Sequence, residues 1–311
     1  MNELEQHLIF EFVYHNPHKV FINEDRSTVP GIDVILLKFL ELTKEQVYEV
    51  SRNGGTVTKI YNDINELGSS KLFFNSLNMK ITMSLSAKST IEGGIAANME
   101  YKYYGEDTKI PIDMEFNITA PVDSEFRRQI FLGIGHELTH AYNIWQWMMK
   151  NKKDFDFYNF NEKSRYTKFK ETIFDVNNER ALKAIHYRLS RLEMNAYIAQ
   201  LRQELQMNSY QIRDSKSAMK AIKSTRSYIA NYEYLERNIY MLNSITDKNL
   251  QQNIIFYTNY IAGKKFTNYN QVLKYYNERW FYYKKEYVTK ASKIAFDIYS
   301  ENHYIIDGNE I

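Results

Sequence analysis

Two histidines one helical turn apart, with a glutamate beside the first, are the residues of this sequence best suited by type and spacing to do chemistry. His136 and His140 are four residues apart, and on a helix such residues lie one above the other on the same face. Both imidazoles could therefore bind one tetrahedral metal ion. Glu137 would lie beside that metal, where it could hold a water molecule and accept its proton. The spacing predicts a metal centre with an adjacent general base.

The residues around this motif predict a buried helix. Apolar side chains occupy most sides of residues 130–145: Phe131, Leu132, Ile134, Leu138, Ala141, Tyr142 and Trp145. Histidine and glutamate side chains inside such a helix are costly unless something compensates them. A metal ion would do so. The alternative is a pair of core histidines satisfied by hydrogen bonds.

A catalytic zinc ion takes three protein ligands and a water molecule, so the two histidines need a third partner. No histidine follows at the spacing H-E-x-x-H-x-x-G-x-x-H, since Asn143 stands where the glycine would be. Residues 176–206 predict a second long helix, and Glu193 lies on the flank of its apolar stripe. The small Ala196, one turn on, would let the two helices approach closely.

Other assignments remain open for this third position. Glu179, Glu204 and His186 are further candidates from the same helix. Glu193 could instead be a helix-flank residue paired with a basic side chain such as Arg188 or a surface lysine. Glu193 is taken first, because an ionised carboxylate beside an apolar stripe needs a cation.

Two segments together resemble the gluzincins, the zinc metallopeptidases whose third ligand is a glutamate on a following helix. They are HELTHA at residues 136–141, preceded by LGIG at 132–135, and LEMNAY at 192–197. The first is similar to segments of short bacterial effector metallopeptidases and related phage proteins. The second departs from the usual N-E-x-x-[SA] pattern, because Leu192 replaces the asparagine while Ala196 fits.

The resemblance implies a zinc-dependent endopeptidase acting on a protein or peptide substrate. Zn²⁺ would be held by His136, His140 and Glu193, and would lower the pKa of its water toward neutrality, with Glu137 as general base. A hydroxyl donor would stabilise the oxyanion: Tyr197 is taken first, with Tyr187 and Tyr210 as alternatives. The substrate would pair with an edge strand, residues 110–118 first and 93–99 second. Asn143 would either orient a ligand or be a plain surface group.

The elements expected to position these residues make an α+β fold of the zincin type. Period-two alternation predicts three strands within residues 78–86, 91–104 and 110–118, which we expect to form a small antiparallel meander. The motif helix would start near residue 123 and end near residue 150, followed by a surface loop over 151–170.

Helices are expected on both sides of this core. Three helices are expected before the core: 32–42, a second that begins at the capping pattern of Thr43 and Gln46 and ends at Gly54-Gly55, and 56–67. Three more are expected after it: 214–244, 247–262 and 270–301. We expect three regions, 1–70, 71–210 and 211–311. The tyrosine-rich helices of the last region are expected to use their aromatic side chains mainly in a core; the alternative is a nucleic-acid or partner surface.

Composition excludes several classes of protein. The 40 basic and 38 acidic residues leave a formal net charge of +2, which indicates no polyanionic partner. The absence of cysteine excludes disulfides and thiolate zinc sites. The first residues lack the basic-then-apolar order of a signal peptide, and no apolar run has the length of a membrane span. We expect a protein made in the cytoplasm, with no membrane partner.

Two other functions compete with the peptidase. Twenty-six tyrosines with abundant Asn, Lys and Ile are typical of phages and low-GC bacteria, so a virion-associated structural protein with a zincin fold is the first alternative, beside a delivered effector. Glu137 favours activity, since a structural site needs no general base. The second alternative is a DNA-binding regulator built on residues 32–67. Its helices lack a basic face, so nucleic acid is not an expected partner.

Overall fold

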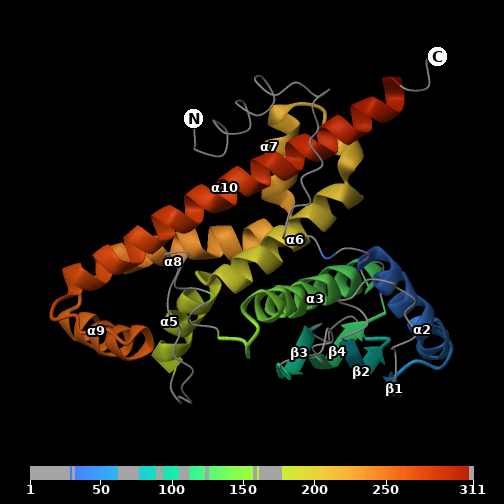
Figure 1. Cartoon of the computed structure of the whole chain (residues 1–311), viewed down its shortest axis with the longest axis horizontal. Helices are drawn as coiled ribbons and strands as arrows, with labels where there is room; N and C mark the ends of the chain where they lie inside the picture. The colour runs from blue at the N-terminus through green and yellow to red at the C-terminus, as the bar shows by residue number, and fades with distance from the viewer. Residues whose placement is uncertain are drawn as a thin grey trace. The chain divides into compact units, whose positions relative to one another are not determined.

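The chain forms two compact units in the computed structural model, shown in Figure 1. The structure describes residues 29, 32–61, 77–88, 94–104, 112–122, 126–156, 160 and 177–307. Residues 25–155 make up the sheet unit, and residues 156–311 belong to the helical unit. The protein is α+β and mostly helical, as predicted. The division into regions 1–70, 71–210 and 211–311 stays a prediction.

The described residues of the sheet unit form two helices and four strands. Their bounds are α2 Ile32–Asn53, β1 Thr56–Tyr61, β2 Leu77–Ser86, β3 Gly94–Tyr101, β4 Ile112–Pro121 and α3 Phe126–Asn151. The sheet order is β1-β2-β4-β3, and β2 pairs with β4 in parallel while the other pairs are antiparallel. The predicted antiparallel meander is therefore wrong. Period-two alternation decides which side chains share a face and leaves open which strand lies next to which.

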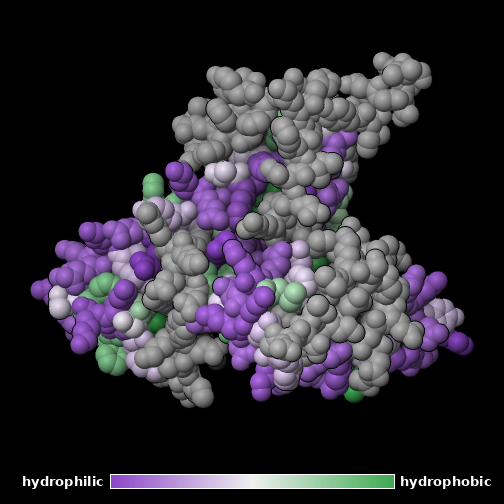
Figure 2. Space-filling model, viewed as in Figure 1, coloured by the Kyte–Doolittle hydropathy of each residue, from purple (hydrophilic) through white to green (hydrophobic). Residues whose placement is uncertain are grey.

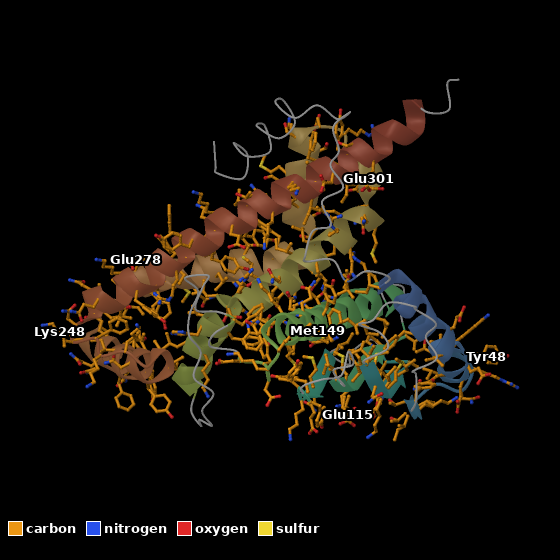
Figure 3. The ribbon with its side chains drawn as sticks, in the orientation of Figure 1. Tyr48, Glu115, Met149, Lys248, Glu278 and Glu301 are labelled. Carbon is orange, nitrogen blue, oxygen red and sulfur yellow. The ribbon has the colours of Figure 1, made fainter. Side chains whose placement is uncertain are left out.

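The faces of the strands follow the prediction. Met79, Ile81, Met83 and Leu85 of β2 are all buried, and Lys80 on the other face forms an ion pair of 2.8 Å with Glu115 of β4. Figure 3 shows Glu115 on the side of the sheet away from α3.

One side of the motif helix packs on this sheet. Its sheet-facing residues are buried in the same core as the strands: Ile130, Ile134, Leu138 and Ala141. A Cβ atom at Gly133 would lie 2.2 Å from the Cδ1 atom of Ile95 on β3, so a larger residue at this position would require the Ile95 side chain to shift. The helix runs to Asn151, close to the predicted end.

The N-terminal helices differ from the prediction. Residues 32–53 form one continuous helix, and the segment predicted as a third helix begins with β1. Gly54 and Gly55, both with positive φ, end α2 as predicted. Thr43 lies inside α2 and does not start a helix, and its expected capping partner Gln46 makes a different contact.

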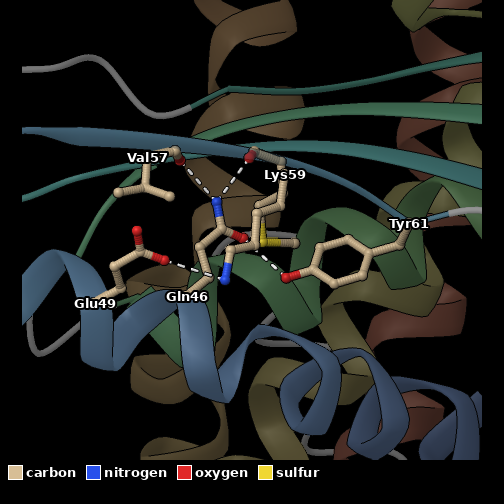
Figure 4. Close-up of polar contacts among 6 residues, drawn as sticks. Gln46, Glu49, Val57, Lys59 and Tyr61 are labelled. Atoms are coloured by element: carbon tan, nitrogen blue, oxygen red, sulfur yellow. Dashed lines mark hydrogen bonds and ion pairs between the residues drawn. The ribbon is translucent and has the colours of Figure 1, made fainter.

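Gln46 joins α2 to the sheet (Figure 4). This fully buried side chain donates from Nε2 to the carbonyl oxygens of Val57 (2.7 Å) and Met83 (2.8 Å), and its Oε1 accepts from the Tyr61 hydroxyl at 3.1 Å. One amide therefore satisfies groups on both β1 and β2, which buried polar groups require.

Replacing Gln46 with leucine is expected to destabilise the protein by about 2 kcal/mol, because buried acceptors lose their donor. Urea unfolding would measure this loss. Lys59→Ala is the matched control: Lys59 forms an exposed 3.1 Å ion pair with Glu49 in the same region, and exposed pairs contribute little to stability. An equal effect of both substitutions would contradict the role given to Gln46.

The helical unit contains six α-helices within its described residues. They are α5 Asn177–Arg188, α6 Arg191–Met207, α7 Ser215–Ser224, α8 Tyr234–Asn243, α9 Lys248–Ala262 and α10 Tyr269–Asp307, with a π-helix at Tyr228–Glu233. The single helix predicted over 176–206 is wrong. Ser190 has extended backbone angles and caps α6, accepting a hydrogen bond from the Glu193 N–H at 3.3 Å. The helix predicted over 214–244 is likewise divided into α7, the π-helix and α8.

Aromatic side chains form much of the core of the helical unit, as predicted. Tyr276, Tyr283 and Tyr287 are at most 1% exposed. On the face drawn in Figure 2 the described surface is mainly hydrophilic, with apolar side chains in small clusters. Phe256 of α9 is among the exposed apolar side chains. No described helix has both the length and the apolar character needed to cross a membrane. Residues 1–28 and most of the loop predicted over 151–170 lie outside the described residues.

Candidate metal centre

The two motif histidines share one face of α3. Helical spacing places His136 and His140 on the side of the helix opposite the residues that pack on the sheet. His140 is 2% exposed and His136 is half-buried, and their ring centroids lie 4.9 Å apart with the planes at 85°. Contacts with the sheet therefore hold one face of α3, and the two histidines lie on a different face.

Side chains within α3 support this part of the helix. The Thr139 hydroxyl donates to the Gly135 carbonyl at 2.8 Å, and Asn143 Nδ2 donates to the Thr139 carbonyl at 2.7 Å. Asn143 is 6% exposed, so the alternative of a plain surface group is wrong. Its role toward a ligand stays a prediction. Glu137 is half-buried, between the histidine face and the sheet face.

Glu193 lies in the first turn of α6 and is 3% exposed. Ser190 and Glu193 match the capping-box pattern S-x-x-E, in which the glutamate would accept from the serine N–H. Here the Ser190 N–H donates instead to the Tyr187 carbonyl at 2.9 Å, so the box does not hold the Glu193 carboxylate. The partial positive charge at the helix N-terminus favours the ionised form of this side chain.

His136, His140 and Glu193 form a group that could hold a metal ion. Each offers one ligand atom, and these atoms all lie within 4.8 Å of one another. Two imidazoles and a carboxylate are donors that suit divalent first-row metals, zinc among them. The donor chemistry therefore fits the group expected from the sequence.

The other candidate ligands are used elsewhere or lie outside the description. His186 is fully buried, and its Nε2 lies 2.7 Å from the Tyr276 hydroxyl. Burial, with a smaller contribution from the Arg279 charge, lowers the pKa of His186 to about 3. Glu204 accepts from the backbone N–H groups of Arg226 (2.6 Å) and Ser227 (3.2 Å). The side chain of Glu179 is not described.

Tyr197 is the tyrosine candidate with the best-defined surroundings. It is half-buried, and Arg188 Nη1 donates to its hydroxyl oxygen at 3.3 Å. Tyr187 is 43% exposed, and the side chain of Tyr210 lies outside the described residues. The contact with Arg188 was not predicted, because the break at Ser190 that brings the two residues together was missed.

The structure also corrects the choice of substrate strand. β4, the first choice, pairs with β2 on one side and β3 on the other, so it has no open edge. β3 lies at one edge of the four described strands, and this was the second choice.

Comparison of the chain with protein families, curated proteins and solved structures finds no match. The functional inference therefore depends on the residues of this site.

Proposed function

We propose that the protein is a zinc-dependent endopeptidase. The observation that carries the proposal is the convergence of His136, His140 and Glu193, with Glu137 next to the first ligand in sequence. A structural metal site would be supported by the first three residues alone. The carboxylate beside them supports a site that moves protons during hydrolysis.

The residues of the chain have separate roles in this reaction. Bound zinc would supply a water molecule of lowered pKa and would polarise the substrate carbonyl. Glu137 accepts the proton of the attacking water and passes it to the leaving amine. Tyr197 donates a hydrogen bond to the oxyanion. The peptide lies along the edge of β3, where backbone hydrogen bonds would hold it with little dependence on its sequence.

Metal content tests this site directly. We expect about one zinc ion per chain in the parent protein and loss of zinc from His140→Ala and Glu193→Ala, with the affinity lowered more than about 100-fold. Elemental analysis of each protein after dialysis would measure how much zinc it retains. Glu204→Gln is the matched control: Glu204 is a buried glutamate of the same helix that accepts from two backbone N–H groups, and the amide oxygen of a glutamine can keep only one of these contacts.

Two results would count against the proposal. Zinc retained by Glu193→Ala would show that another residue is the third ligand. A parent protein that takes up no zinc after loading would favour the structural alternative with a pair of core histidines.

A further inference from the structure

We propose that β3 binds peptides that carry a lysine or arginine, and that Glu100 recognises the basic side chain. This inference rests on the proposed function, because it names the class of substrate that the same site would take. β3 lies at one edge of the four described strands, so a peptide would pair with it as a further strand. Backbone hydrogen bonds hold any such peptide, and the side chains beside it then decide which sequence binds best.

The motif helix α3 runs along β3. Gly133 of α3 lies against Ile95, and Met148, further along α3, packs with Met99, further along β3. The two motif histidines follow Gly133 by three and seven residues, the spacing of one helix face, so they lie on the flank of α3 toward this edge strand. With a rise of about 1.5 Å per residue in the helix and about 3.3 Å in the strand, the histidines are level with a point near Ala97. A peptide paired with β3 would pass the histidines there.

Glu100 lies on the outer face of β3, the face turned away from α3, and its side chain is exposed. The residues of the inner face pack against the core of the sheet unit: Ile95, Ala97, Met99 and Tyr101. A peptide strand has the same alternation, so one set of its side chains would lie beside these apolar residues and the other set beside Glu100. The peptide expected to bind best therefore carries a basic residue with apolar residues on either side.

The charges around Glu100 favour a cation. Three carboxylates and one lysine line a hollow of about 520 Å³ on the outer face of the sheet, which is large enough to take a long side chain. Glu115 pairs with this Lys80 at 2.8 Å, and Asp113 accepts from the Asn78 amide at 2.8 Å. No described side chain forms an ion pair or hydrogen bond with Glu100. Glu100 lies opposite Asp113 in the strand register, and like charges in that arrangement destabilise a sheet unless a cation lies beside them.

Three short labelled peptides would test this recognition. Each alternates threonine and valine, and its central threonine is replaced by lysine, glutamine or glutamate. The full chain would be incubated with excess zinc, and binding would be followed by fluorescence anisotropy. Mass spectrometry of the same mixtures would show where each peptide is cleaved.

We expect the parent to bind the lysine peptide about fivefold more tightly than the glutamine peptide, as for one exposed ion pair. Glu100→Gln should bind these two peptides equally, and Glu100→Lys should favour the glutamate peptide. Unfolding temperatures should match the parent, because Glu100 is exposed. Cleavage should fall within about three residues of the lysine, since Glu100 lies about three residues along β3 from the level of the histidines.

Glu49→Gln is the matched control, because it removes the same charge from an exposed glutamate of the sheet unit that pairs with Lys59. This variant should keep the parental preference for the lysine peptide. An equal loss of preference in Glu49→Gln and Glu100→Gln would overturn the proposal, because the overall charge of the chain would then attract the peptide.

Two further results would overturn the proposal. Equal binding of the three peptides by the parent, or no binding of any, would show that β3 does not select a basic side chain. A preference for lysine that persists in Glu100→Gln would show that another group recognises it. Failure of the proposed function is distinguishable: binding that depends on Glu100, without cleavage by a chain that holds zinc, would support the recognition and contradict the peptidase.

Discussion

Replacing Glu137 with glutamine is expected to lower the rate of peptide hydrolysis by a factor of about 10²–10⁴ while the chain keeps its zinc. Glutamine has nearly the shape of glutamate and can still hold a water molecule, but it cannot accept a proton at neutral pH. The loss should appear in kcat, because the substrate contacts are unchanged. Cleavage of a peptide library followed by mass spectrometry would identify a substrate, and the rate on that peptide would then be compared between the two proteins.

The metal content of Glu137→Gln separates this role from ligation. Glu137 precedes Leu138, which is fully buried on the sheet side of α3, so the substitution is not expected to move the helix. A variant that keeps its zinc and hydrolyses at the parental rate would show that another group is the base. A variant that loses its zinc would assign Glu137 to the ligands instead.

Acidification below pH 6.5 is expected to destabilise the helical unit through His186. Burial lowers the pKa of His186 from its ordinary value of 6.5 to about 3 in the folded protein. The unfolded chain takes up this proton near pH 6.5 and the folded chain only near pH 3, so stability falls as the pH falls between these values. The slope is about 1.4 kcal/mol per pH unit, or about 2 kcal/mol between pH 6.5 and pH 5.

Urea unfolding at several pH values, compared between the parent and His186→Gln, would measure this contribution. The glutamine cannot titrate, so its stability should fall less steeply over the same range. Tyr276→Phe is the control: it removes the 2.7 Å contact with His186 but keeps the imidazole buried, so its pH dependence should resemble that of the parent. Equal slopes in the parent and His186→Gln would contradict the assignment.

Much of the local structure could be predicted from the sequence. Alternation along residues 78–86 and 112–118 gave the buried faces of β2 and β4, and Gly54 and Gly55 gave the end of α2. The H-E-x-x-H spacing gave a helix with both histidines on one face. The start of α6 was also legible, since Ser190 and Glu193 carry a capping pattern that the prediction overlooked.

Several other features depended on tertiary structure. Gln46 reads as a helix-cap residue beside Thr43, and only the nearby strands make it a buried link between β1 and β2. In the sheet, β4 lies between β2 and β3, and it therefore pairs with β2 in parallel. Alternation along each strand does not specify this order of strands.

The candidate site also depends partly on the sequence alone and partly on tertiary structure. The sequence by itself determined that His136 and His140 share a face with Glu137 beside them, because residues one turn apart are related by helix geometry alone. Tertiary structure decided that Glu193, rather than His186 or Glu204, joins them, and that Arg188 reaches Tyr197. His186 and Glu204 find partners 90 and 23 positions away in the chain. Such partners are chosen by packing and by the need to satisfy buried polar groups, and neither leaves a short-range pattern in the sequence.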